Sequence, residues 1–105
     1  MKTQLTQIRK RDGQIVNFEQ KKIATAIYKA MVSAGKDEEG RERARELAEK
    51  VVAAIEKNFS RSAEIPSVED VQDVVEQVLI KEGLSEVAKA YILYRQQRAD
   101  IRGLK

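Results

Sequence analysis

The sequence predicts an α+β fold, mainly α, in which a short N-terminal β-hairpin packs on a four-helix bundle. An Asp12-Gly13 dipeptide separates two short apolar segments near the N-terminus, and this dipeptide favours a hairpin turn. Most of the remaining chain repeats apolar residues at helical spacing. The length of 105 residues is typical of one domain. We therefore expect residues 1–105 to form a single domain.

The hairpin is expected over about residues 5–18. Its Asp-Gly dipeptide favours a type I′ turn, in which both central residues have positive φ. Asn17 followed by Gln20 resembles a capping box, which predicts a first helix over about residues 18–34. Apolar residues at helical spacing mark the buried face of this helix: Ile23, Ile27, Ala30, Met31 and Ala34.

A second helix is expected over about residues 40–59. Its apolar residues form one long stripe at spacings of three and four. They are Ala44, Leu47, Ala48, Val51, Ala54, Ile55 and Phe59. A stripe of this length predicts a helix that contributes to the core along most of its length.

The third helix is expected over about residues 67–82, where Ser67 follows Pro66 and can cap the helix together with Asp70. Valine is a mediocre helix former, so a strand is the competing interpretation. Helical spacing and the acidic residues between the valines favour a helix. The predicted apolar face contains Val68, Val71, Val75, Val78 and Leu79.

The fourth helix is expected over about residues 85–102, with Ser85 as its N-cap. Its predicted apolar face contains Val87, Ala88, Tyr91, Ile92 and either Leu93 or Tyr94. The spacing does not decide between these last two residues. Core packing is the expected role of the tyrosines on these helices.

Composition narrows the possible functions. The chain has no cysteine and no histidine, which excludes disulfides, thiolate or imidazole metal ligands and the most common nucleophile–base systems. Binding of Mg²⁺ by carboxylates alone remains possible.

No apolar run approaches membrane-spanning length, and the N-terminus lacks the apolar segment of a signal peptide. We expect a cytoplasmic protein with no membrane partner.

Charge is distributed unevenly along the chain. Residues 1–35 carry a net charge of +5 and residues 85–105 a net charge of +3, whereas residues 60–84 carry −4. If the two ends of the chain meet in the fold, their cations form one basic surface, with the acidic middle opposite. This asymmetry favours an anionic partner such as a nucleotide or a nucleic acid. Its alternative explanation is a set of solvated helix faces with no ligand.

Three cations are candidates for phosphate binding. Lys10 and Arg11 flank the predicted turn, and Lys22 lies near the start of the first helix. Cations beside unpaired helix N–H groups suit a polyphosphate. Further along the chain, Arg95, Arg98 and Arg102 follow one helix face. That row could complete the pocket, or it could be a salt-bridged surface.

Three sequence blocks resemble the ATP-cone family. The first is K-R-D-G followed by V-x-F-x-x-x-K-I (10–23), the second is I-P-S-V-E-D-V-Q (65–72), and the third is V-A-K-A-Y-I-L-Y-R-Q-Q-R (87–98). Their order and spacing agree with the family over nearly the whole chain. The resemblance is strongest to the cones of anaerobic or cobalamin-dependent ribonucleotide reductases. It implies a hairpin over four helices and reversible binding of ATP or dATP as an effector, without catalytic turnover.

The resemblance also implies roles for individual residues. Phosphate binding would fall to Lys10, Arg11, Lys22 and Arg98, and the adenine pocket would contain Ile8, Ile23, Val68, Gln72 and Tyr94. Mg²⁺ could accompany the nucleotide. Glu19 departs from the Asn or Asp that is frequent in the family at this position. The implied partner is a ribonucleotide reductase catalytic domain or subunit, and the implied output is a nucleotide-dependent change in oligomeric state.

Two other hypotheses account for the same charges. A nucleic-acid-binding helical domain would use the basic ends of the chain, although the sequence shows neither an aromatic platform nor a recognition-helix motif. A structural or oligomerising bundle would have no ligand. Binding of adenine nucleotides distinguishes the leading hypothesis from both.

Overall fold

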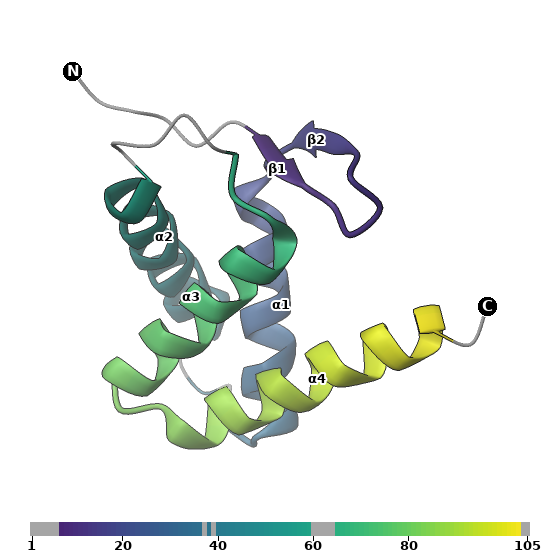
Figure 1. Ribbon diagram of the computed structural model, residues 1–105. Helices are drawn as coiled ribbons and strands as arrows, with labels where there is room; N and C mark the ends of the chain where they lie inside the picture. Colours follow the sequence, from purple (N-terminus) through teal and green to yellow (C-terminus); the bar gives the residue numbers. More distant parts are fainter. Residues whose placement is uncertain (1–6, 37, 39, 60–64, 104–105) are drawn as a thin grey trace.

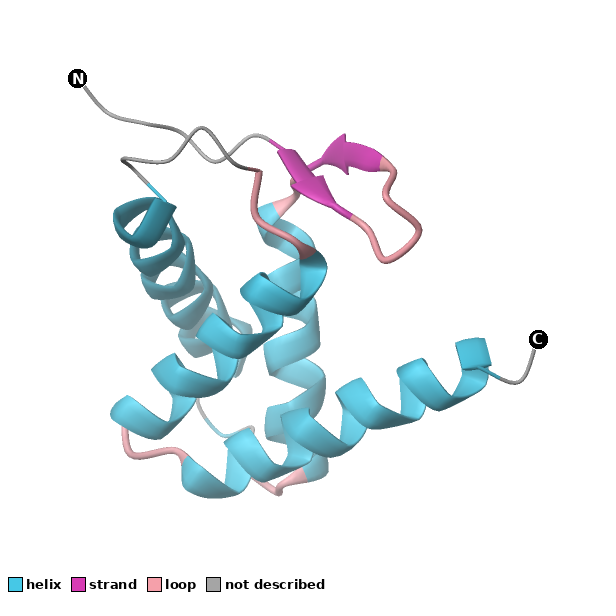
Figure 2. Cartoon of the chain, in the orientation of Figure 1, coloured by secondary structure: helices cyan, strands magenta, loops and turns pink. Residues whose placement is uncertain are grey.

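A computed structural model of the chain describes residues 7–36, 38, 40–59 and 65–103, and it confirms the predicted fold class (Figure 1). A two-stranded antiparallel hairpin leads into four helices joined by loops (Figure 2). The elements are β1 (Gln7–Arg9), β2 (Ile15–Asn17), α1 (Gln20–Ser33), α2 (Gly40–Phe59), α3 (Val68–Lys81) and α4 (Ser85–Gly103). Helices α1 and α3 each pack against both α2 and α4, which arranges the bundle around one core.

The hairpin turn differs from the expected type I′ turn. Among the described residues only glycines have positive φ, and in this turn that residue is Gly13, at 91°. The Gly13 N–H donates to the Lys10 carbonyl at 2.9 Å, and the Lys10 N–H donates to the Gln14 carbonyl at 2.8 Å. Asp12 Oδ1 accepts the Gln14 N–H at 3.0 Å. This is the pattern of a three-residue loop with glycine in the left-handed position, so the type I′ prediction is wrong.

The predicted cap of the first helix is also wrong. Asn17 is the last residue of β2, where it pairs with Gln7, and Glu19 is the N-cap of α1. Within the described part of the chain, the Glu19 side chain accepts none of the first-turn N–H groups, and that turn contains no acidic residue. The strand continues through Asn17 because hairpin pairing fixes its backbone before the helix begins.

The predicted cap of the third helix is confirmed. Ser67 Oγ accepts the Asp70 N–H at 3.0 Å, and Asp70 Oδ2 accepts the Ser67 N–H at 3.0 Å. These reciprocal bonds form a capping box. The valine-rich segment that follows is helical, as its spacing indicated, so the competing strand interpretation is excluded.

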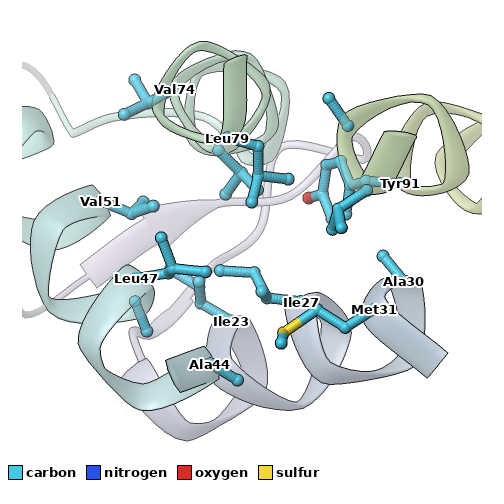
Figure 3. Packing of buried hydrophobic residues seen from close by; sticks show 14 of the residues in the cluster. Ile23, Ile27, Ala30, Met31, Ala44, Leu47, Val51, Val74, Leu79 and Tyr91 are labelled. Atoms are coloured by element: carbon cyan, nitrogen blue, oxygen red, sulfur yellow. The ribbon is translucent and has the colours of Figure 1, made fainter. Parts of the chain in front are cut away.

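The core lies between the four helices (Figure 3). Most of the predicted apolar positions are buried, and the largest fully buried side chains are Ile27, Leu47, Val51, Ile55, Val75, Leu79 and Val87. Burial raises the pKa of Tyr91 to about 12, although nearby Arg95 opposes this shift. On α4, Leu93 is 59% exposed and Tyr94 is half-buried, which settles the alternative that the spacing left open. The side chain of Phe59 lies outside the described residues.

The hairpin is attached to the bundle near the start of α3. The Arg9 N–H donates to the Pro66 carbonyl at 2.9 Å, and Arg9 forms an isolated parallel bridge with Ser67. Ile8 and Phe18 are partly buried against the core. The turn is therefore held beside the first turn of α3 by backbone bonding on one side and apolar packing on the other.

A cluster of three charged residues joins α2 to the end of α3. Glu82 Oε1 accepts from Lys50 Nζ at 2.9 Å and from Arg43 Nη2 at 3.5 Å. The Lys50 hydrogen bond lowers the pKa of Glu82 below its ordinary value, against the smaller opposing effect of burial.

Among the described residues, none of the helices combines the length and hydrophobicity needed to cross a bilayer.

We expect Glu82→Gln to lower the melting temperature at neutral pH. Because the pKa of Glu82 is lower in the folded state than in the unfolded state, its contribution is present above the unfolded value of 4.5 and is lost as pH falls. The difference from wild type in thermal unfolding should therefore shrink at acid pH. Glu46→Gln is a matched control, because the ion pair that the structure shows for Glu46 is a 3.5 Å contact with Arg43 within α2. A difference of equal size at neutral and acid pH would contradict this account.

Candidate functional site

The predicted phosphate-binding segments lie on one side of the molecule. The hairpin turn projects from the bundle on the same side as the C-terminal half of α4 (Figure 1). A hollow of about 270 Å³ lies between the turn and the bundle. The residues that line it come from the turn, α3 and α4, and they are Arg11, Glu76, Ile92, Arg95 and Gln96. The structure therefore brings Arg11 to α3 and α4, which are far from it in the sequence.

Lys10 and Lys22 are both exposed and available to a ligand. Lys10 lies in the hairpin loop, and Lys22 lies in the first turn of α1. As described above, neither an acidic residue nor the Glu19 side chain neutralises that turn. The helix dipole and the N–H groups without a side-chain cap favour an anion at this turn, although the Lys22 N–H donates to the Glu19 carbonyl at 3.1 Å. These two lysines can reach phosphate oxygens without first breaking an ion pair that the structure shows.

Ile8 and Ile23 contribute mainly to packing. Ile23 is only 8% exposed and belongs to the core, and Ile8 is partly buried against that core. Together they form the apolar base between the hairpin and α1. A ligand could contact Ile8 at its exposed edge, whereas contact with Ile23 would be limited to the small exposed part of its side chain.

Val68 and Gln72 lie one helical turn apart at the start of α3, and both are half-buried. Gln72 Oε1 is shielded from solvent and has no hydrogen-bond partner among the described residues. A buried acceptor without a partner typically costs about 1–3 kcal/mol. A ligand with an N–H or O–H donor would lower this cost, but it can reach the shielded oxygen only after the Gln72 side chain moves.

Tyr94 faces a different hollow from the one beside Arg11. It lies 6.5 Å from Tyr91 between ring centroids, with the rings tilted by 40°. Its hollow, of about 600 Å³, lies between α1 and α4 and includes Lys29, Ser33, Lys89 and Leu93 in its lining. The structure does not bring Tyr94 into the lining of the Arg11 hollow. The side chain of Arg98 lies outside the described residues.

Arg95 is salt-bridged, which was one of the two interpretations of the arginine row. Its Nη1 donates to Asp73 Oδ1 at 3.0 Å and to Glu76 Oε2. Burial of Arg95 opposes its charge, but the hydrogen bonds that Arg95 donates to Glu76 and Asp73 outweigh that effect and raise the pKa of Arg95. The sequence signal that could have identified this contact is the acidic face of α3 itself.

A further ion pair links the hairpin to the same face of α3. Arg11 Nε lies 3.1 Å from Glu69 Oε2. The acidic segment therefore lies between the two basic ends of the chain. The expectation that it would lie opposite one continuous basic surface is wrong, because Glu69, Asp73 and Glu76 are each bound to an arginine. None of these contacts was predicted from the sequence.

A metal site built from carboxylates is not found in the part of the chain that the structure describes. No group of three or more acidic side chains there is arranged to hold a metal ion.

Comparison with known proteins places the chain in a family. A model of the ATP cone domain matches residues 6–100. The vitamin B12-dependent ribonucleoside-diphosphate reductase of Thermoplasma acidophilum is 45% identical over 107 residues, covering 93% of this chain and 12% of that protein. The same enzyme of Mycobacterium tuberculosis is 36% identical over 98 residues, covering 93% of this chain and 13% of that protein.

A third relative is a reductase subunit. The ribonucleoside-diphosphate reductase subunit alpha of Chlamydia trachomatis is 38% identical over 98 residues, covering 89% of this chain and 9% of that protein. The chain thus spans between 9% and 13% of the length of these three relatives. The similarity to cobalamin-dependent reductases that the sequence blocks indicated is confirmed. The family match and the hairpin over four helices show that the chain belongs to the ATP cone domain family.

Proposed function

We propose that this chain is a regulatory domain that reversibly binds ATP or dATP and does not itself catalyse a reaction. Residues 1–105 would act as one cytoplasmic unit that controls a ribonucleotide reductase catalytic domain or subunit. Family membership supports nucleotide binding and allosteric regulation. The similarity to ribonucleoside-diphosphate reductases supports ribonucleotide reductase as the enzyme under control.

The triphosphate would bind beside the hairpin turn. Lys10 and Arg11 come from the turn, Lys22 comes from the uncapped first turn of α1, and Arg98 would approach from α4. Charge-assisted hydrogen bonds from lysine and arginine are among the strongest contacts to phosphate. In this proposal, phosphate charge neutralises cations that the fold otherwise leaves at the surface.

The observation that carries the proposal is the buried Oε1 of Gln72, which has no partner among the described residues. After the Gln72 side chain turns toward the ligand, an adenine amino group could donate to this oxygen, and the amide nitrogen of Gln72 could donate in return to a ring nitrogen. Val68, Ile8 and Ile23 would supply apolar contact to the base. A role for Tyr94 at the ring face remains part of the proposal, although Tyr94 lines the hollow between α1 and α4 and not the hollow beside Arg11.

Regulation would follow from different contacts made by ATP and dATP. The two nucleotides differ only at the 2′-hydroxyl, so any difference in output must come from a free-energy difference produced by that group. We propose that the output is a change in oligomeric state of the whole reductase. Mg²⁺ would arrive bound to the triphosphate.

Calorimetric titration should detect binding of ATP and dATP to wild type, and Lys22→Ala should weaken it. Loss of a charge-assisted contact typically costs about 1.5–3 kcal/mol, which corresponds to at least a roughly tenfold weaker affinity. Lys21→Ala is the matched control, because Lys21 lines a hollow between α1 and α2 together with Tyr28 and Arg45. Its affinity should stay close to wild type.

The titration also separates the other hypotheses. If neither nucleotide binds at millimolar concentration, the proposed function is wrong. If the protein binds duplex DNA tightly and does not bind ATP, the nucleic-acid hypothesis is supported instead. Equal losses for the Lys21 and Lys22 variants would contradict the proposed position of the phosphates.

Gln72→Leu should weaken nucleotide binding while leaving the unliganded protein at least as stable as wild type. These effects have opposite signs because leucine removes a buried acceptor without a partner, yet cannot bind a polar edge of the base. Thermal unfolding without ligand and calorimetry with ATP measure the two effects. Gln77→Leu, at an exposed position of α3, is the control. A Gln72 variant that loses stability but keeps full affinity would refute the role given to this residue.

A further inference from the structure

Three carboxylates form a row on α3 and bind two arginines from other elements. Glu69, Asp73 and Glu76 follow the spacing i, i+4 and i+7, which keeps them on one side of the helix. Glu69 pairs with Arg11 of the hairpin turn, and the other two hold Arg95 of α4. The row therefore connects the hairpin and α4 through α3.

The two arginines are held differently. Arg95 is bound by two carboxylates at once, and its side chain is only 20% exposed. Of the described residues, Glu69 alone is shown bound to Arg11, at 3.1 Å, with side-chain exposures of 44% for Arg11 and 40% for Glu69. An exposed single ion pair is weak, whereas a partly buried arginine with two partners is held more firmly. The Arg11–Glu69 pair is thus the one that a ligand can displace.

We propose that Glu69 sets the nucleotide affinity of this site by competing with the triphosphate for Arg11. This inference rests on the proposed function, because it assumes that Arg11 binds phosphate. Without nucleotide, the carboxylate occupies the guanidinium. Because Arg11 Nε carries a single hydrogen, phosphate oxygens that bind at this nitrogen replace the carboxylate.

This exchange links ligand binding to a contact between elements. The hairpin stays attached through the Arg9–Pro66 backbone bond, so the strand pairing does not have to open. What changes is the side-chain link between the hairpin turn and the first turn of α3. Glu69 follows the capping box of Ser67 and Asp70, whose reciprocal bonds keep its place on the helix fixed.

Neutralising this carboxylate should strengthen nucleotide binding. We expect Glu69→Gln to bind ATP about two- to fivefold more tightly than wild type in calorimetric titration, because an exposed ion pair contributes up to about that factor. Asp73→Asn is the matched control. It removes the same charge one turn further along the same row, but its partner is Arg95, and Glu76 still holds that arginine.

The control separates competition from a general charge effect. If Asp73→Asn and Glu69→Gln strengthen binding equally, the effect is long-range electrostatics and the proposal is overturned. Unchanged affinity in Glu69→Gln overturns it as well, while leaving the proposed function intact. Weaker binding in that variant would mean that Glu69 contacts the nucleotide or its Mg²⁺, which also overturns competition. Absence of ATP binding to wild type overturns this inference and the proposed function together.

A second measurement follows the exchange directly. In the ¹⁵N-labelled chain, the Arg11 Nε–Hε resonance should shift when Glu69 becomes glutamine, because the structure pairs that nitrogen with the carboxylate. Addition of ATP to wild type should shift the same resonance. If ATP binds and this resonance stays unchanged, Arg11 does not change partner and the proposal fails.

Discussion

Attachment of β1 to the segment before α3 is the contact on which the candidate site depends. One backbone hydrogen bond, from Arg9 to Pro66, joins residues that are 57 positions apart in the sequence. Pro66 is buried and has no N–H to satisfy, so its carbonyl is the group that the strand must pair. This bond places the hairpin turn beside α3. Every proposed contact between Arg11 and the helices depends on that placement.

The acidic and basic residues of this fold do not lie on opposite faces of the molecule. An acidic row on α3 lies between a basic turn and a basic helix, and it neutralises one arginine from each. The exposed lysines at positions 10 and 22 are the cations that this row is not shown to reach. A site built in this way combines fixed cations, whose partners are protein carboxylates, with available ones that can attract an anion.

Much of the fold was predictable because its signals are local. Apolar spacing identified most core positions of the four helices but missed Val74, and Pro66, Ser67 and Asp70 identified the start of α3. The errors occurred where two local signals compete. Asp12 and Gly13 favour more than one hairpin loop, and pairing across the strands selects the three-residue form. Asn17 can cap a helix or end a strand, and its pairing with Gln7 decides for the strand.

The candidate site was less predictable, because side-chain partners depend on tertiary placement. Sequence spacing aligned Arg95 with the later arginines, but only packing of α4 against α3 reveals Asp73 and Glu76 beside it. The Arg11–Glu69 pair likewise joins two segments separated by the whole of α1 and α2. A cation pattern in a sequence therefore indicates how many positive charges a site could offer. Which of them a ligand can use depends on the carboxylates that the fold brings to meet them.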